Sequence, residues 1–257
     1  YKGTSISLIG IDKNYNSKRN NFFAFWLTDW MKDFDSLAQK KWFCWNFYLT
    51  NNHIKHETKD LPYCTIRYQD WKNYCLKGLE NLSIKEFNVQ SITNLKKYYE
   101  IKLENGEEIF AKKIYDSRTP KLENEKVKQH FFGYLIETKQ MINSGSVTLM
   151  DFRVEQKMGL HFMYCLPIDE NRILVESTVF SSEIQEDDWY QKQILDYIET
   201  KLNLSEYKTN FTIWICCPSY NYHKFLGRYK QYYFFPFVDY NCDTKRRQNV
   251  IRNVASG

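Results

Sequence analysis

The side chain best suited to acid–base chemistry is Glu176, a carboxyl group inside an otherwise apolar segment. Residues 172–180 alternate, so one face of a predicted strand carries Leu174, Glu176, Thr178 and Phe180. A carboxyl group between Leu174 and Phe180 is expected to be partly desolvated, which raises its pKa and makes it a usable acid near neutral pH. The structural alternative is a place at the sheet margin, where the carboxylate meets solvent or a lysine.

Other polar side chains have patterns that favour structural roles. Asp151 and Arg153 share one face of a preceding strand, which predicts an ion pair with a neighbouring strand. His130 and His161 could titrate near neutral pH, but neither has Cys or Asp at metal-ligand spacing, so we predict no metal site. Two serines lack the Gly-x-Ser-x-Gly setting of a hydrolase nucleophile, Ser117 and Ser177.

Near the amino end, an apolar run over residues 5–11 is followed by Asp12, a pattern typical of a buried parallel strand. An acid at the carboxyl end of such a strand is where dinucleotide-binding folds bind a ribose hydroxyl. That motif also needs a Gly-rich turn about 20 residues earlier, for which the sequence has no room. A plain strand-ending aspartate fits the pattern equally well.

The elements that must position Glu176 are the best-patterned part of the sequence. Three strands in a meander are predicted over residues 147–155, 160–167 and 172–180. An amphipathic helix follows over residues 186–202. Its expected apolar stripe consists of Tyr190, Ile194, Leu195, Ile198 and Leu202.

Upstream of the meander the patterns are mixed. Residues 20–45 are dense in aromatics without a single period, which predicts loops and short strands. A helix is predicted over residues 67–82, with Asp70 near its amino end. The turn dipeptide Asn105-Gly106 predicts a hairpin between residues 98–103 and 108–115. Residues 121–145 have a mixed pattern to which we assign no element.

Composition is typical of a folded protein with a solvated surface. A chain of 257 residues suits one large domain or two small ones, and the 43% apolar and 26% charged content is ordinary for a folded protein. The aromatic content of 18% suits a core, a wide apolar ligand or a membrane interface. Lys and Glu are mixed almost everywhere, and the basic run is confined to residues 245–247, so a solvated surface is favoured over a nucleic-acid site.

The cysteines and the apolar runs indicate the compartment. Seven cysteines without a Cys-x-x-Cys pair suggest neither a zinc ribbon nor a disulfide framework, so we expect a reducing cytosol. No signal peptide is visible, and no apolar run approaches the ~18 residues that a membrane span needs. The sequence begins with Tyr1 rather than Met, so a fragment of a longer protein is expected.

Five ordered segments together match a known family: residues 115–118, 129–138, 150–156, 162–167 and 174–181. They resemble bacterial-type lycopene cyclases (lycopene β-cyclase), a branch of the FAD/NAD(P)-binding flavoprotein superfamily. Weaker similarity at residues 9–13, at Phe25-Trp26 and at Arg67 with Asp70 extends the resemblance over about residues 5–208.

The resemblance implies an α/β fold plus antiparallel β structure. It places a partial Rossmann-type FAD/NAD(P)-binding domain in residues 1–118 and an antiparallel-sheet substrate domain in residues 119–208, with a divergent tail over residues 209–257. The sequence departs from the family in three ways. Residues 209–257 match neither the strand nor the second Gly-rich flavin-contacting segment that the family has after Tyr207. The Gly-x-Gly-x-x-Gly loop that would cradle the flavin pyrophosphate is absent, and Asn20, Asn21 and Phe22 replace an Asp-Arg-Thr pattern. The chain is therefore expected to be incomplete at both ends.

The resemblance also implies a reaction. Members close the linear ends of lycopene into β-rings in carotenoid biosynthesis, a redox-neutral isomerisation that uses reduced FAD maintained by NAD(P)H. Glu176 matches the acidic position of a Leu-Glu-Glu-Thr-like motif and is expected to be the acid or the cation stabiliser. Asp116 would contact the flavin or nucleotide, Asp12 the ribose, and Arg67 begins a crossover helix at the cofactor.

The same resemblance implies a linear carotenoid as the partner molecule and an association with the membrane surface, because the substrate is a membrane lipid. Together with the mixed charges and the cysteine usage, this predicts no nucleic-acid partner and a cytoplasmic chain peripheral to a membrane. The main alternative is a truncated or decayed family member that neither binds flavin nor catalyses cyclisation. A third class is an aromatic-rich nucleic-acid binder, whose binding would fall steeply with salt.

Overall fold

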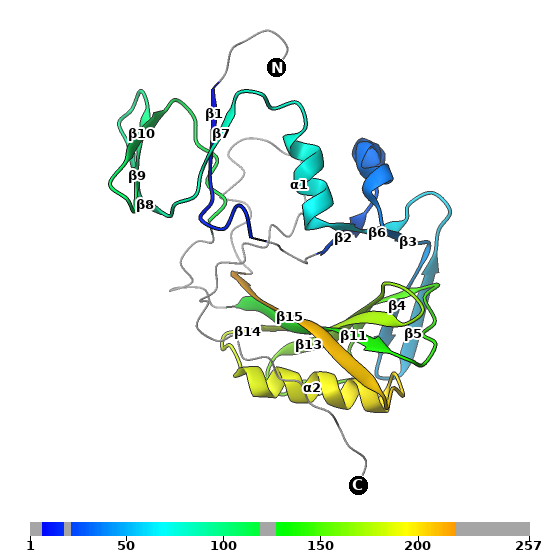
Figure 1. Cartoon of the computed structure of the whole chain (residues 1–257). Coiled ribbons are helices and arrows are strands. Elements are labelled where there is room, and N and C mark those ends of the chain that lie inside the picture. Colours follow the sequence, from blue (N-terminus) through cyan, green and yellow to red (C-terminus); the bar gives the residue numbers. More distant parts are fainter. Residues whose placement is uncertain (1–6, 18–21, 119–126, 219–257) are drawn as a thin grey trace. The chain divides into compact units, whose positions relative to one another are not determined.

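The computed structural model describes residues 7–17, 22–118 and 127–218, which divide into two units (Figure 1). Unit 2 consists of Ala24–Asp35, Lys40–Thr65 and the described residues from Arg118 on. Unit 1 consists of the described residues up to Phe23, Ser36–Gln39 and Ile66–Ser117. Both units are assembled from segments that are separated in the sequence, so neither coincides with a single stretch of chain.

A seven-stranded sheet is the largest element of unit 2. Its strand order is β15 (Tyr207–Pro218), β11 (Lys128–Thr138), β14 (Arg172–Ser181), β13 (Leu160–Pro167), β12 (Val147–Asp151), β4 (Cys44–Leu49) and β5 (Asn52–Glu57). Neighbouring strands are antiparallel except β12 and β4, which are parallel. The predicted meander of β12, β13 and β14 is confirmed, although β12 ends at Asp151, before residue 155.

Four strands of this sheet come from residues outside the predicted meander. Residues 121–145, to which no element was assigned, contain the 11-residue strand β11. Because β11 is covered on both faces, its apolar residues run almost continuously and do not alternate. Strand β15 crosses residue 209, so the predicted tail begins inside the sheet. Strands β4 and β5 come from residues predicted to belong to the cofactor domain.

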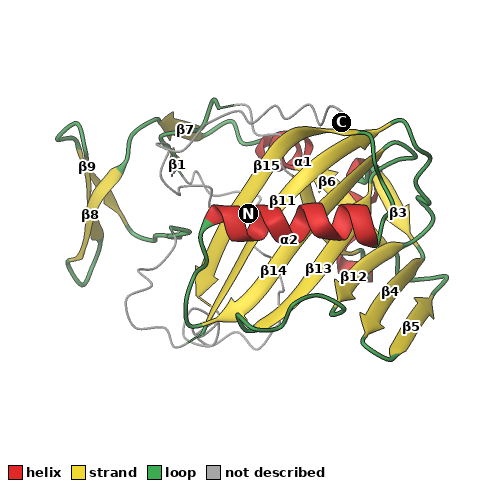
Figure 2. Cartoon of the chain, turned by 90° about the horizontal axis from the view of Figure 1, so that it is seen from below, coloured by secondary structure: helices red, strands yellow, loops and turns green. Residues whose placement is uncertain are grey.

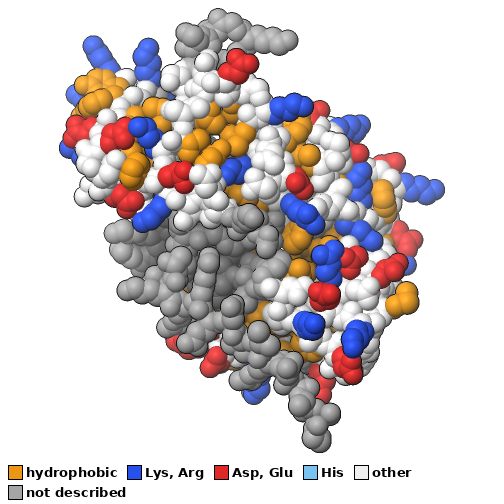
Figure 3. All heavy atoms as spheres, viewed as in Figure 1, with side chains coloured by type: hydrophobic (Ala, Val, Ile, Leu, Met, Phe, Trp, Pro, Cys, Tyr) orange, Lys and Arg blue, Asp and Glu red, His pale blue; other side chains and the backbone are white. Residues whose placement is uncertain are grey.

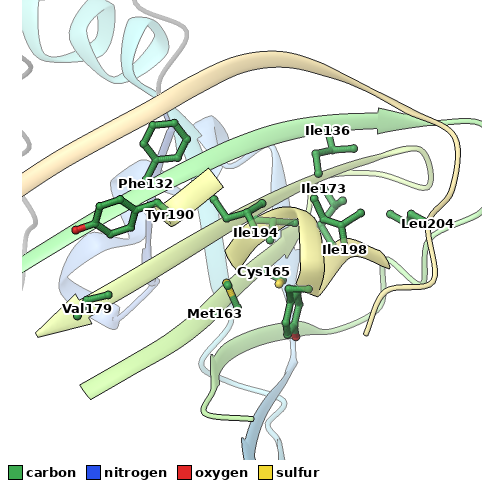
Figure 4. Close-up of a cluster of buried hydrophobic side chains, with 12 residues drawn as sticks. Phe132, Ile136, Met163, Cys165, Ile173, Val179, Tyr190, Ile194, Ile198 and Leu204 are labelled. Atoms are coloured by element: carbon green, nitrogen blue, oxygen red, sulfur yellow. The ribbon is translucent and has the colours of Figure 1, made fainter. Parts of the chain in front are cut away.

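Helix α2 (Asp187–Thr200) lies across one face of the sheet (Figure 2). Tyr190, Ile194 and Ile198 point from α2 into a core shared with the strands, drawn in Figure 4. The predicted stripe is corrected at two positions: Leu195 is 37% exposed and Tyr197 is buried. The helical period explains the difference, since residues 190, 194, 197 and 198 share one face and residue 195 lies outside it.

An aromatic layer packs against the opposite face of the sheet. It includes a three-stranded sheet in the order β2 (Phe22–Trp26), β6 (Tyr63–Arg67) and β3 (Lys40–Trp42), and the 3-10 helix η1 (Asp29–Leu37) precedes β3. Trp42, Trp45 and Tyr63 share a buried cluster with Leu174 of β14. The predicted short strands are confirmed as β2 and β3, whereas residues 29–37 form the 3-10 helix η1, which was not predicted.

Unit 1 contains a parallel strand pair, a helix and a small antiparallel sheet. Strand β1 (Leu8–Ile11) pairs in parallel with β7 (Leu82–Lys85). The predicted hairpin is confirmed as β9 (Tyr99–Leu103) and β10 (Glu108–Ala111), and β8 (Val89–Asn94) completes a three-stranded sheet. Helix α1 (Tyr68–Leu76) is shorter than predicted, because Gly78 has a φ of 81°, a left-handed conformation that ends helices.

Charges of both signs are mixed on the surface shown in Figure 3. Lys and Arg side chains on that face are interspersed with Asp and Glu over the described residues. This distribution is typical of a solvated surface, whereas a nucleic-acid site gathers basic residues on one face.

Asp151, at the end of β12, is hydrogen-bonded to helix α2. Its side chain is fully buried, accepts hydrogen bonds from the Arg153 guanidinium at 2.7 and 2.9 Å, and accepts another from the Tyr197 hydroxyl at 2.8 Å. Burial alone would raise the pKa of Asp151, but these hydrogen bonds outweigh it and hold the pKa below its usual value. The predicted cross-strand pair of Asp151 is corrected, because its ion partner Arg153 is two residues away on the same segment.

We predict that Asp151→Asn lowers the free energy of unfolding by about 3 kcal/mol, because it leaves a buried hydrogen-bond network without its charge. Urea denaturation measures this change. Asp169→Asn is the matched control, since Asp169 pairs with Arg172 at an exposed site where such pairs contribute less than about 1 kcal/mol. The difference should be present above about pH 4 and disappear as the pH falls through the lowered pKa of Asp151.

Candidate functional site

Glu176 lies in the middle of β14, between two paired strands. Its register partners are Gly133 of β11 and Tyr164 of β13. Ile173, Val175 and Val179 of β14 belong to the core under α2, whereas Leu174 belongs to the cluster with the aromatic layer. Because side chains alternate along a strand, Glu176 faces the aromatic layer, on the face predicted from the sequence.

Gly133 gives Glu176 the space it occupies. A Cβ atom at position 133 would lie 2.5 Å from Glu176 Cγ and 3.3 Å from the Val175 carbonyl oxygen. The Glu176 side chain therefore lies across the backbone of β11, where no residue larger than glycine fits without displacing it.

The carboxyl group of Glu176 is partly buried, and burial raises its pKa to about 8. Within the described part of the chain, no hydrogen bond or ion pair reaches this carboxyl group. Desolvation without a compensating positive charge favours the neutral form. The raised pKa favours the neutral acid at neutral pH, in the direction that the alternating pattern predicted. Because Glu176 lies between two paired strands, its position is not at the margin of the sheet.

Two tyrosine hydroxyls adjoin this carboxyl group. The hydroxyl groups of Tyr63 of β6 and Tyr164 of β13 are 2.8 Å apart. Burial raises the pKa of both phenols, and negative charge on Glu176 raises it further. Sequence reasoning missed this pair, because the two residues are 101 positions apart and neither carries a local signal.

Beyond Glu176, the same face of the sheet carries mainly apolar side chains, which form an apolar strip. The next paired row consists of Phe131, Thr178 and Phe162, and the following row contains Phe180 and Leu160. The ring centroids of Phe162 and Phe180 are 6.3 Å apart, and those of Phe152 and Phe162 are 5.5 Å apart. Leu160 is 54% exposed, so the strip reaches the surface of unit 2. Such a strip suits an extended apolar molecule with one end at the acid.

A polar hollow of about 320 Å³ lies elsewhere in unit 2. Its lining residues are Lys40, Glu137, Ser144, Asp169, Glu170, Asn171 and Arg172. Charged groups would lose hydration against a hydrocarbon, so this hollow does not suit an apolar ligand.

Histidines and serines of the sheet core have structural partners. The His161 ring and the Ser177 hydroxyl are joined by a hydrogen bond of 2.8 Å between Nε2 and Oγ, and His161 Nδ1 also bonds the Glu155 carbonyl oxygen. His130 contacts the Tyr190 hydroxyl and Ser181 Oγ, and burial lowers its pKa to about 4. Within the described residues, no group of three metal-ligating side chains occurs.

The three predicted cofactor contacts lie in unit 1, whereas Glu176 lies in unit 2. Asp12 directly follows β1, where its Oδ1 accepts a hydrogen bond from the Asn14 amide at 2.9 Å. Arg67 precedes α1 and is exposed, and Asp116 is exposed beyond the end of β10. An acid at the carboxyl end of a parallel strand fits a nucleotide ribose, so Asp12 is compatible with the expected role. The roles of Arg67 and Asp116 stay predictions.

Several solved structures share this fold over part of their length, although their sequences are no more than 11% identical to this chain. The chain resembles a geranylgeranyl bacteriochlorophyll reductase-like protein from Thermoplasma acidophilum, with a TM-score of 0.59 and 10% identity over 82% of this chain. It also resembles the flavin-dependent brominase Bmp2, with a TM-score of 0.51 and 11% identity over 82% of this chain. A variant of halogenase PltM in complex with FAD matches 73% of this chain with a TM-score of 0.51 and 8% identity.

These likenesses define the class of fold, a mixed α/β structure with several sheets that resembles FAD-dependent enzymes over part of the chain. The chain spans 59%, 61% and 46% of the lengths of those three proteins. Residues 2–214 match the family described as lycopene cyclase protein, and the chain belongs to this family. No curated protein matches the sequence. The resemblance identified from the five segments is confirmed.

We predict that Gly133→Ala lowers the free energy of unfolding by about 1 to 3 kcal/mol, because the added methyl group overpacks the contact with Glu176. Thermal or urea denaturation measures this cost. In a Glu176→Ala background the cost should shrink, because the Cγ atom that clashes is gone. Gly145→Ala is the control, since Gly145 lies in an exposed turn. An equal loss of unfolding free energy in both backgrounds would show that position 133 does not need glycine to make room for Glu176.

We also predict a pH-dependent stability that depends on Glu176. The neutral carboxyl group is favoured in the folded chain, where its pKa is about 8, against a usual value of 4.5. The stability it contributes is therefore fully present below about pH 4.5 and is lost as the pH rises through 8. Glu176→Gln should flatten this part of the stability profile, as measured by urea denaturation at several pH values. An unchanged slope would contradict the raised pKa.

Proposed function

We propose that this chain carries the catalytic acid of a lycopene cyclase, which closes the linear ends of lycopene into β-rings in carotenoid biosynthesis. Membership of the lycopene cyclase family supports this proposal. The observation that carries it is Glu176, a carboxyl group with a pKa near 8 beside an apolar strip. A hydrocarbon substrate offers only π electrons, so the enzyme must supply a proton in a place without water.

The reaction balances without an oxidant. The O–H bond of Glu176 breaks, and its proton forms a C–H bond at the terminal double bond of the linear chain. The π electrons of the next double bond attack the resulting carbocation and close a six-membered ring. A proton then leaves the ring and returns to the Glu176 carboxylate, so the product is an isomer of the substrate.

The chain's own residues exclude water and stabilise charge in this reaction. The rings of Phe131, Phe162 and Phe180 line the face beside Glu176 and offer π surfaces to a passing positive charge. The Glu176 carboxylate provides the anion that the cation needs. Reduced FAD, maintained by NAD(P)H, would add stabilisation of the cation or delivery of a proton, as the family resemblance implies. Asp12 is the residue that would hold its ribose.

A linear carotenoid is the substrate that this function requires, and such a molecule resides in membranes. We therefore place the chain in the cytoplasm, peripheral to a membrane. Within the described residues, none of the helices has the length and apolar character needed to cross a bilayer.

Glu176→Gln should reduce β-carotene formation at least about 100-fold, the effect expected for loss of a general acid. The measurement is β-carotene content in lycopene-producing cells that express the chain. Glu137→Gln is the matched control, because Glu137 is an exposed acid of the same sheet whose bond to Asn210 a glutamine oxygen preserves. Equal β-carotene output from Glu176→Gln and wild type would remove Glu176 from the mechanism.

The alternative is a family member that neither binds flavin nor cyclises lycopene. The replacement of the family's Asp-Arg-Thr pattern by Asn20, Asn21 and Phe22 favours it. Visible flavin absorbance that stays with the purified chain after desalting would support the cyclase, and weaker retention by Asp12→Asn would assign the ribose contact. A colourless preparation that yields no β-carotene would support the alternative.

A further inference from the structure

The hydroxyl groups of Tyr63 and Tyr164 carry two hydrogens, and the hydrogen bond between them uses one. Their oxygens are 2.8 Å apart, so one hydroxyl donates to the other. The accepting hydroxyl keeps its own hydrogen. Within the described part of the chain, neither hydroxyl has a second hydrogen-bond partner. One of the two hydroxyl groups can therefore donate a further hydrogen bond.

Tyr164 of this pair lies on the same face of the sheet as Glu176. Tyr164 is the direct register partner of Glu176 across β13 and β14, and such partners have Cβ atoms about 4.5 to 5.5 Å apart on the same face. Negative charge on Glu176 raises the pKa of both phenols, in addition to the larger increase that burial causes. On its other side Glu176 meets Gly133, which has no titratable group. Cys165, whose side chain is under α2, is the other group whose pKa responds to Glu176.

We propose that Tyr63 and Tyr164 form a hydroxyl chain that donates a hydrogen bond to the Glu176 carboxylate when that group has given up its proton. This inference rests on the acid role proposed for Glu176. Tyr63 donates to Tyr164, and Tyr164 donates its own hydrogen to the carboxylate. A hydrogen bond to a charged oxygen is stronger than one to a neutral oxygen, and the bond from Tyr63 polarises Tyr164 further.

The hydroxyl chain favours the state after proton transfer over the state before it. Neutral Glu176 carries its own hydrogen and gains little from a further donor, whereas the carboxylate gains a charge-assisted bond. Only an interaction that strengthens during the reaction accelerates the chemical step. Tyr63 and Tyr164 are therefore positioning residues, because they act through Glu176 and not on the substrate.

Infrared titration of the Glu176 carbonyl band tests the proposal without turnover, with the band identified by its loss in Glu176→Gln. Tyr164→Phe removes the donor to the carboxylate, so the pKa of Glu176 should rise by about one to two pH units. Tyr63→Phe removes only the polarising bond and should raise it less. Tyr207→Phe is the matched control, since Tyr207 packs against the α2 core of the same sheet, and it should leave the pKa unchanged.

An unchanged Glu176 titration in Tyr164→Phe would overturn the proposal, as would an equal shift in Tyr207→Phe. If the phenylalanine variants do not fold, a ring-fluorinated tyrosine at position 164 gives a second measurement. Fluorination makes the hydroxyl a stronger donor, so the pKa of Glu176 should fall, and a rise or no change would overturn the proposal. A shift in Tyr164→Phe together with no β-carotene from wild type would support the hydroxyl chain and refute the cyclase function.

Discussion

Strand β14 is covered on both faces, and the burial of a single carboxyl group on one of them determines most of the site. Helix α2 covers Ile173, Val175 and Val179, while the aromatic layer covers Leu174. Glu176 belongs to the second face, where no ion partner compensates its charge within the described residues. Its environment therefore holds it neutral. This position in the sheet also brings Glu176 against Gly133 of β11 and beside Tyr164 of β13.

The polar groups of the α2 core show how unusual this carboxyl group is. Asp151 is fully buried and fully hydrogen-bonded, and the rings of His130 and His161 are each bonded through both nitrogens. Buried polar groups in folded proteins are normally satisfied in this way. Glu176 lacks such partners within the described part of the chain, although His130 and His161 lie on the two strands that pair with β14. A desolvated acid without a partner is a feature of reactive sites.

The fold does not select the reaction by itself. Solved proteins with this architecture include a brominase, a halogenase and a reductase-like protein. One architecture can therefore accommodate different chemistries, and function must be inferred from the site. Here the site combines a neutral acid with rings from three neighbouring strands, β11, β13 and β14. That combination suits proton transfer to a hydrocarbon, and it agrees with the family to which the chain belongs.

Local pattern by itself determined the meander, the hairpin at Asn105-Gly106, the amphipathic character of α2 and the face on which Glu176 lies, because alternation and helical period are set by near neighbours. Where both faces of a strand are buried, as in β11, the pattern disappeared. Tertiary structure alone joined β4 to β12 and brought Tyr63 to Tyr164. These contacts unite segments about 100 residues apart, and strand pairing at that distance is decided by packing of the whole sheet rather than by local sequence.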